Sequence, residues 1–84
     1  MQELIYETKG VCASRIYLQV ENGILIHVNF EDGCDGNTRG ISRLVEGMPV
    51  KEVIQRLKGI RCGDKETSCP DQLTRALEKI LDSL

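Results

Sequence analysis

Apolar and polar residues alternate along the first third of the chain, and this period of two predicts a β-sheet. Three strands are expected, at residues 4–8, 15–21 and 24–30. Asn22 and Gly23 separate the last two strands and favour a two-residue hairpin turn, because both residue types tolerate positive φ angles. The strands should therefore form an antiparallel meander.

One face of this sheet is expected to be buried. In the second strand the apolar face holds Ile16, Leu18 and Val20, and the other face holds Arg15, Tyr17, Gln19 and Glu21. In the third strand the same period places four apolar residues together, namely Ile24, Ile26, Val28 and Phe30. The polar face should stay in contact with water.

Beyond residue 37 the apolar period changes to that of an α-helix, and three amphipathic helices are expected. The first ends at Gly47, the second runs from Pro49 to Gly59, and the third begins at Pro70. Their predicted apolar stripes are Ile41, Leu44, Val45 and Met48, then Val50, Val53, Ile54 and Leu57, and finally Leu73, Ala76, Leu77, Ile80, Leu81 and Leu84. A two-layer α+β domain buries all of them, with a three-stranded antiparallel meander followed by three helices packed on one face.

Length and charge narrow the possibilities. The 84 residues suffice for one domain over residues 1–84, and its core must be aliphatic because the chain has two Tyr, one Phe and no Trp. Eleven basic and thirteen acidic residues are spread along the chain, so no nucleic-acid-binding surface is expected. No apolar run is long enough to span a membrane, and the first residues lack the features of a secretion signal. We therefore expect a cytoplasmic protein.

Four cysteines, Cys12, Cys34, Cys62 and Cys69, are the main candidates for chemistry. In a reducing compartment lasting disulfides are uncommon, which favours metal binding or thiol chemistry. Four thiolates can form a tetrahedral zinc site or hold an iron–sulfur cluster. Cys12 lies between the first two strands and Cys34 follows the third, so a meander brings both to one end of the sheet. All four would meet if the third helix began at this end.

Cys69 directly precedes Pro70, a favoured first residue of a helix, so its sulfur is expected at the N-cap, where the positive helix end favours a thiolate. Basic residues near three of the cysteines in the sequence could offset the charge of four thiolates; these are Arg39, Arg61 and Lys65. The cysteines are separated by 21, 27 and 6 residues, which matches no compact zinc finger. Two alternatives therefore stay open, because some cysteines could be small core residues or could pair as disulfides.

Several blocks of the sequence resemble the TSCPD domain family. Residues 67–71 spell its signature, Thr-Ser-Cys-Pro-Asp, and residues 33–37, 40–48 and 59–63 are similar to its other blocks. The likeness covers nearly the whole chain and is greatest for small stand-alone members with four cysteines. This resemblance implies that Cys12, Cys34, Cys62 and Cys69 are metal ligands, with zinc or an iron–sulfur cluster as the cofactor.

Such members are related to a domain at the C-terminus of cobalamin-dependent ribonucleotide reductases. The resemblance therefore implies a link to DNA precursor synthesis and a protein partner, for which a ribonucleotide reductase is the candidate. Radical reduction of a nucleotide needs a barrel-sized catalytic domain and a cobalamin pocket, which 84 residues cannot hold. We expect no complete active site in this chain, and a role as an accessory module or a thiol-redox relay for such an enzyme.

A weaker resemblance is to the U-type iron–sulfur scaffold proteins. Their cluster cysteines would correspond to Cys34 and Cys69, with Cys62 as a third candidate. Those proteins place a cysteine between helices and use further Asp or His ligands, which do not align with this sequence. This resemblance would imply an open, labile cluster, whereas a zinc site would be closed and structural.

Other candidate sites are weaker. His27 lies on the strand face opposite Ile26 and Val28, and a surface position is expected for it. The glycine-rich residues 33–40 could bind an anion, but a metal-binding turn explains their glycines better. The acidic residues near the loops are expected to be solvated charges or helix caps rather than an acid–base pair; these are Asp32, Asp35, Asp64 and Asp71.

Overall fold

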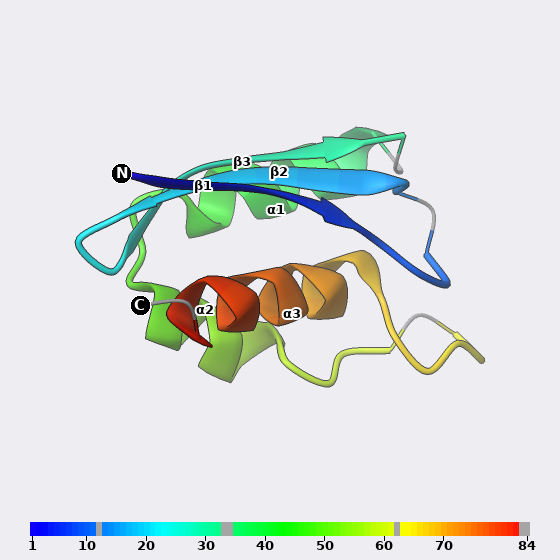
Figure 1. The fold of residues 1–84 in the computed structure, drawn as a ribbon. Coiled ribbons are helices and arrows are strands. Elements are labelled where there is room, and N and C mark those ends of the chain that lie inside the picture. The colour runs from blue at the N-terminus through cyan, green and yellow to red at the C-terminus, as the bar shows by residue number, and fades with distance from the viewer. Residues whose placement is uncertain (12, 33–34, 62, 83–84) are drawn as a thin grey trace.

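The computed structural model describes residues 1–11, 13–32, 35–61 and 63–82, apart from the side chains of residues 35 and 37. Within these ranges three strands precede three helices, as predicted (Figure 1). The strands are β1 (Gln2–Glu7), β2 (Arg15–Glu21) and β3 (Ile24–Glu31), and the helices are α1 (Asp35–Val45), α2 (Val50–Leu57) and α3 (Cys69–Asp82). They form two layers, with the sheet on one side and the helices on the other.

The sheet is the predicted antiparallel meander, with the strand order β1-β2-β3. The predicted inner face of β2 is confirmed, because Ile16, Leu18 and Val20 are all buried in the core. Asn22 and Gly23 have φ angles of 53° and 76°, which confirms the predicted hairpin turn.

The predicted inner face of β3 is wrong at its first half. The pairing of β2 with β3 shifts between Gln19 and Val20, so that Val20 pairs with Leu25 and Gln19 pairs with His27. Ile26 is the extra residue of this β-bulge, and it is exposed whereas Leu25 is fully buried. Because of the bulge, the residues of β3 that precede it point to the opposite side of the sheet from the one that a strict period of two predicts.

The outer edge of β3 is partly occupied by the end of α1 and the turn that follows it. The Leu25 amide donates to the Met48 carbonyl (2.9 Å), and the Gly47 amide donates to the Leu25 carbonyl (2.7 Å). Further along, the Val28 amide donates to Oε2 of Glu46 (3.2 Å), which also lies 2.9 Å from Nδ1 of His27. His27 is half exposed, as expected for a surface residue.

Helix α1 begins earlier than predicted and turns a different face to the sheet. It starts at Asp35, so Gly36 and Gly40 lie inside a helix and not in a metal-binding turn. Leu44, expected in the apolar stripe, is 77% exposed, whereas Thr38 and Val45 are buried. Because α1 packs against β3, at the edge of the sheet, only a narrow face of the helix is covered.

The position of Gly40 leads to a prediction about stability. Gly40 has a helical backbone, and a methyl group there would meet no described atom within 4 Å. Gly40→Ala should raise the free energy of unfolding by about 0.5–1 kcal/mol, since alanine loses less backbone entropy on helix formation. Chemical denaturation measures this difference. Gly47→Ala is the control and should lower stability instead, because Gly47 has a φ of 90°. A loss of stability in Gly40→Ala would contradict the position of Gly40 inside α1.

The other two helices match their predicted stripes. Val50 and Val53 of α2 are buried, and so are Leu73, Ala76, Leu77 and Ile80 of α3, whereas Leu84 lies outside the described residues. Helix α3 packs against β1, and α2 packs against α3. None of the helices in the described part of the chain is long and apolar enough to cross a membrane.

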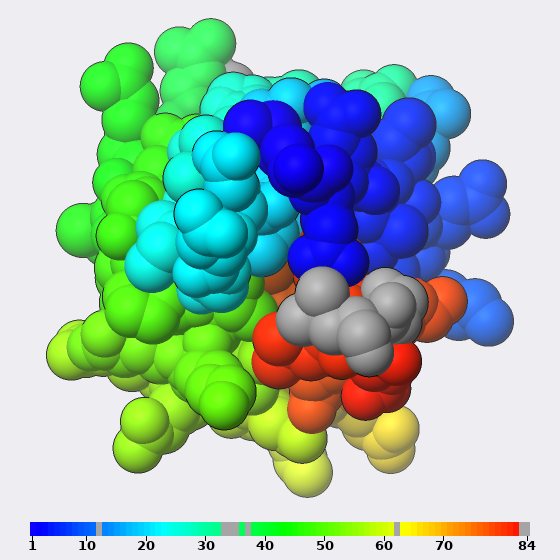
Figure 2. Space-filling model, turned by 60° about the vertical axis from the view of Figure 1, so that its left-hand side comes forward, coloured from blue at the N-terminus to red at the C-terminus, as the bar shows by residue number. Residues whose placement is uncertain are grey.

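The two ends of the layered structure differ. The N-terminus, the β2–β3 hairpin turn and the last turn of α3 lie at one end, which faces the viewer in Figure 2. The described parts of the β1–β2 connection, the end of β3 and the start of α3 lie at the opposite end (Figure 1). Each connection that contains a cysteine therefore has at least one of its described parts at this second end of the domain.

Candidate cysteine site

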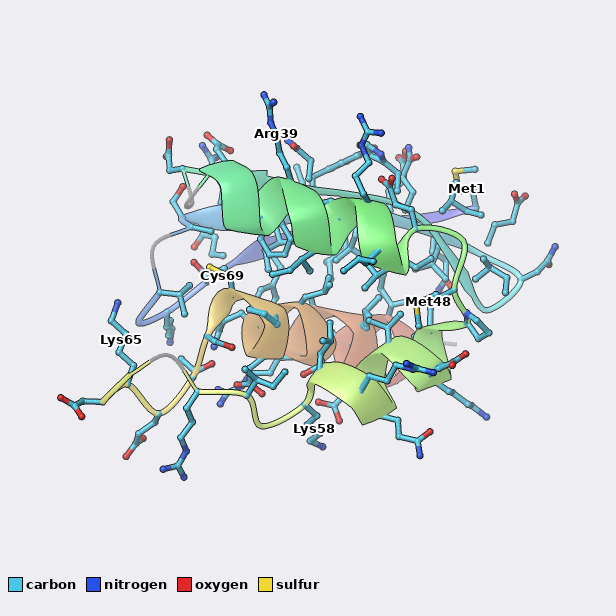
Figure 3. The ribbon with its side chains drawn as sticks, turned by 180° about the vertical axis from the view of Figure 1, so that it is seen from behind. Met1, Arg39, Met48, Lys58, Lys65 and Cys69 are labelled. Atoms are coloured by element: carbon cyan, nitrogen blue, oxygen red, sulfur yellow. The ribbon has the colours of Figure 1, made fainter. Side chains whose placement is uncertain are left out.

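Of the four predicted metal ligands, the structure describes Cys69. It is the first residue of α3, half-buried and not in a disulfide, and its side chain points from this turn toward the sheet layer (Figure 3). Cys12, Cys34 and Cys62 lie outside the described residues, so the predicted cluster of four sulfurs stays a prediction. In the described part of the chain, no three His, Cys, Asp or Glu side chains are grouped to hold a metal ion.

Ser68, and not Cys69, caps α3. The Ser68 hydroxyl accepts a hydrogen bond from the Asp71 amide (3.2 Å), and the Ser68 carbonyl accepts the first helical bond, from the Gln72 amide (2.8 Å). The N-cap therefore lies one residue earlier than predicted, because a serine hydroxyl is a far better acceptor for a free amide than a thiol. Cys69 is thus held inside the first turn of the helix.

The residues around Cys12 are bonded to the end of β3. The Thr8 amide donates to the Ser14 carbonyl (3.2 Å), which closes the connection between β1 and β2. Ser14 then donates from its amide to the Glu31 carbonyl (2.8 Å) and from its hydroxyl to Oδ2 of Asp32 (2.9 Å). The described residues that flank Cys12 and those that precede Cys34 therefore lie side by side, as the meander predicted.

The start of α3 joins the same end of the sheet. The Ser68 hydroxyl donates to the Ile60 carbonyl (2.7 Å), which ties the residues before Cys62 to those before Cys69. The Lys9 amide donates to Oε1 of Gln72 (3.3 Å), which ties the β1–β2 connection to α3. The predicted orientation of the third helix, with its N-terminus at this end, is confirmed for the described residues.

Asp71 is not the solvated charge that the sequence suggested. It is only 4% exposed, and its carboxylate accepts hydrogen bonds from the Gly59 amide (2.7 Å) and the Thr67 hydroxyl (2.5 Å). The Arg75 guanidinium lies 3.3 Å from Oδ2. Burial by itself raises the pKa of Asp71, but these hydrogen bonds and the charge of Arg75 outweigh it, so the pKa lies below the ordinary value of 3.8.

A lowered pKa means that the folded state favours the ionised carboxylate, which therefore stabilises the fold at neutral pH. Asp71→Asn should lower the free energy of unfolding at pH 7 by about 1–3 kcal/mol, because the side chain of Asn has one acceptor oxygen and cannot accept from both Gly59 and Thr67. Urea denaturation at fixed zinc concentration measures the loss. The exposed Asp82, at the end of α3, provides the control. Asp82→Asn should change stability by about 0.5 kcal/mol or less, and equal effects at the two positions would contradict the role given to Asp71.

Sequence reasoning missed most of the polar residues that are buried at this end. Thr67, Gln72 and Thr74 are buried beside Asp71, yet none was singled out as a candidate. The sequence contains part of the signal for this network, because Thr67 and Asp71 belong to the signature at residues 67–71 together with Cys69. Polar residues on the apolar side of an amphipathic helix, such as Thr74 next to Leu73, also indicate a buried hydrogen-bonding network.

These features define a small two-layer α+β domain whose connections between elements contain Cys12, Cys34 and Cys62, and whose last helix begins at a fourth cysteine. The chain belongs to the TSCPD domain family, whose model matches residues 4–81. Comparison with curated proteins gave no match, and neither did comparison with solved structures.

Proposed function

We propose that this chain is a metal-binding module in which Cys12, Cys34, Cys62 and Cys69 together hold one zinc ion or one iron–sulfur cluster. One observation carries the proposal. Hydrogen bonds join the described residues around the four cysteines into one group at one end of the domain. The pairs Ser14–Asp32, Lys9–Gln72 and Ile60–Ser68 are connected to each other by the backbone bonds Thr8–Ser14 and Gln72–Ser68. Each cysteine is within two residues in the sequence of a member of this group.

The donor set suits this function. Four thiolates are the ligands of closed structural zinc sites and also of common iron–sulfur clusters, so the residues themselves fit either group. A bound ion or cluster would cross-link three connections and one helix. This link would add stability to a domain of 84 residues, which is too small to build a large hydrophobic core. The metal would thus act on the structure of the domain, and no catalytic residue is assigned to it.

The proposed module acts by presenting a surface to a protein partner. A ribonucleotide reductase is the partner expected from the sequence resemblance described above, since related domains are appended to cobalamin-dependent enzymes of that class. Calorimetric titration of the metal-loaded chain into a purified reductase should give saturable binding at a fixed stoichiometry. Absence of heat at protein concentrations of tens of micromolar, checked with a second method, would remove this enzyme as the partner.

Metal analysis on protein purified without air tests the central proposal. One equivalent of zinc per chain is expected for the closed site, and iron with sulfide is expected for the cluster. Replacement by Co²⁺ should give the intense absorption of thiolate-bound tetrahedral cobalt, and each single Cys→Ser substitution should weaken it. A chain that contains no metal, and whose four thiols all titrate rapidly, would contradict the proposal and favour the thiol-redox relay.

A further inference from the structure

Two neighbouring side chains of α3 each accept a hydrogen bond from a distant backbone amide. Oδ1 of Asp71 accepts from Gly59 (2.7 Å), and Oε1 of Gln72 accepts from Lys9 (3.3 Å). Gly59 lies three residues before Cys62, and Lys9 lies three residues before Cys12. Both acceptors follow Cys69 within the first turns of α3. The connections that lead to two cysteines are therefore fastened to the part of the helix that carries a third.

Thr67 couples the two acceptors to each other. Its hydroxyl donates to Oδ2 of Asp71 (2.5 Å) and accepts from Nε2 of Gln72 (2.9 Å). The second bond sets the orientation of the Gln72 amide, because a flip of this group would turn Oε1 away from Lys9 and place two acceptors against each other. All three residues are buried, and no buried side-chain nitrogen or oxygen in the described part of the chain lacks a partner.

We propose that Thr67, Asp71 and Gln72 form a positioning unit that sets where the connections to Cys12 and Cys62 lie relative to Cys69. The inference rests on the proposed metal-binding function and deepens it. A fully paired buried network has one low-energy arrangement, so it stabilises the folded backbone that a bound metal requires. Because metal binding is coupled to folding in such small domains, a network that stabilises this arrangement raises the metal affinity. Two residues of the family signature, Thr67 and Asp71, thereby support the site without touching the metal.

Thr67→Val tests this role, because valine keeps the shape of threonine but loses the hydroxyl that joins Asp71 to Gln72. The affinity for Zn²⁺, measured by competition with a chromogenic chelator, should fall about tenfold or more, as it does when groups that orient metal ligands are removed elsewhere. Thr67→Ser restores the hydroxyl and should bind Zn²⁺ nearly as well as the unmodified chain. Amide hydrogen exchange at Lys9 and Gly59 in the zinc-loaded protein should become at least about tenfold faster in Thr67→Val only.

Thr74→Val is the matched control. Thr74 is also buried, but its hydroxyl donates to the Asp71 carbonyl within the helix (2.7 Å), so this hydrogen bond joins α3 to neither connection. Both variants replace a buried threonine hydroxyl by a methyl group, so a general loss of stability would lower the Zn²⁺ affinity of both alike. Equal Zn²⁺ affinities in Thr67→Val and Thr74→Val would overturn the positioning role and leave the metal site intact. Absence of Zn²⁺ binding by the unmodified chain would instead overturn the proposed function, and this inference with it.

Discussion

Removal of the bound metal by a strong chelator is expected to unfold this domain, with a loss of folding free energy on the order of 10 kcal/mol. Native domains of ordinary size have total stabilities of about 5–15 kcal/mol, so a loss of this size leaves little or no folded protein. The buried hydrophobic residues of the described core are all aliphatic, and the aromatic side chains are few. The metal would therefore contribute about as much as the whole net stability of an ordinary domain, which is about 5–15 kcal/mol.

Far-UV circular dichroism measures this effect directly at neutral pH under reducing conditions. The helical signal should collapse when the chelator is added and should return when Zn²⁺ is restored in excess. Chelator that has been saturated with Zn²⁺ beforehand is the control, because it has the same ionic composition but removes no metal. If the protein unfolds at the same urea concentration with and without free chelator, the four cysteines do not hold a structural metal.

Leu77→Ala should lower the free energy of unfolding by about 2–5 kcal/mol, the range found when a fully buried leucine is truncated. Leu77 is on the inner face of α3 and is 0% exposed. The loss combines the transfer of the removed carbon atoms to water with the cavity that remains, since packed neighbours relax only in part. Urea denaturation of the metal-loaded protein at one fixed zinc concentration gives the difference in stability.

Leu44→Ala is the informative comparison, because the helical period predicted both leucines to be buried. Leu44 is 77% exposed on α1, and its truncation should change stability by about 0.5 kcal/mol or less. A loss of several kcal/mol at Leu44 would mean either that α1 turns a different face to β3 or that another molecule buries this leucine. Only the second case makes the unfolding midpoint depend on protein concentration.

The arrangement of elements could be predicted from this sequence because its signals are local. The Asn22–Gly23 turn specifies its own geometry, and the stripes of α2 and α3 repeat over complete turns. The bulge at Ile26 could not be predicted, since the residues around one extra residue in a strand are of the same types as in a regular strand. The early start of α1 was missed for a related reason. Its glycines disfavour a helix by about 1 kcal/mol each, and only packing against β3 overcomes this.

The candidate site was predictable to the extent that it depends on topology. A meander requires the start of β2 and the end of β3 to be neighbours, and the pairing of Arg15 with Glu31 confirms this. The roles of Ser68 and Asp71 were not predictable in the same way. Aspartate side chains are usually exposed to solvent, whereas the carboxylate of Asp71 is bonded to the Gly59 amide, twelve residues away, which no local pattern in the sequence indicates.

The occupied edge of β3 has a consequence for behaviour at high concentration. An open sheet edge can recruit a strand from another molecule, which is a common route to aggregation. At this edge the backbone of Leu25 is bonded to the turn after α1, and the Val28 amide is bonded to Glu46. An incoming strand would first have to break these bonds and displace the Glu46 carboxylate from the Val28 amide. The short turn after α1 thus protects the protein from self-association along β3 while it connects two helices.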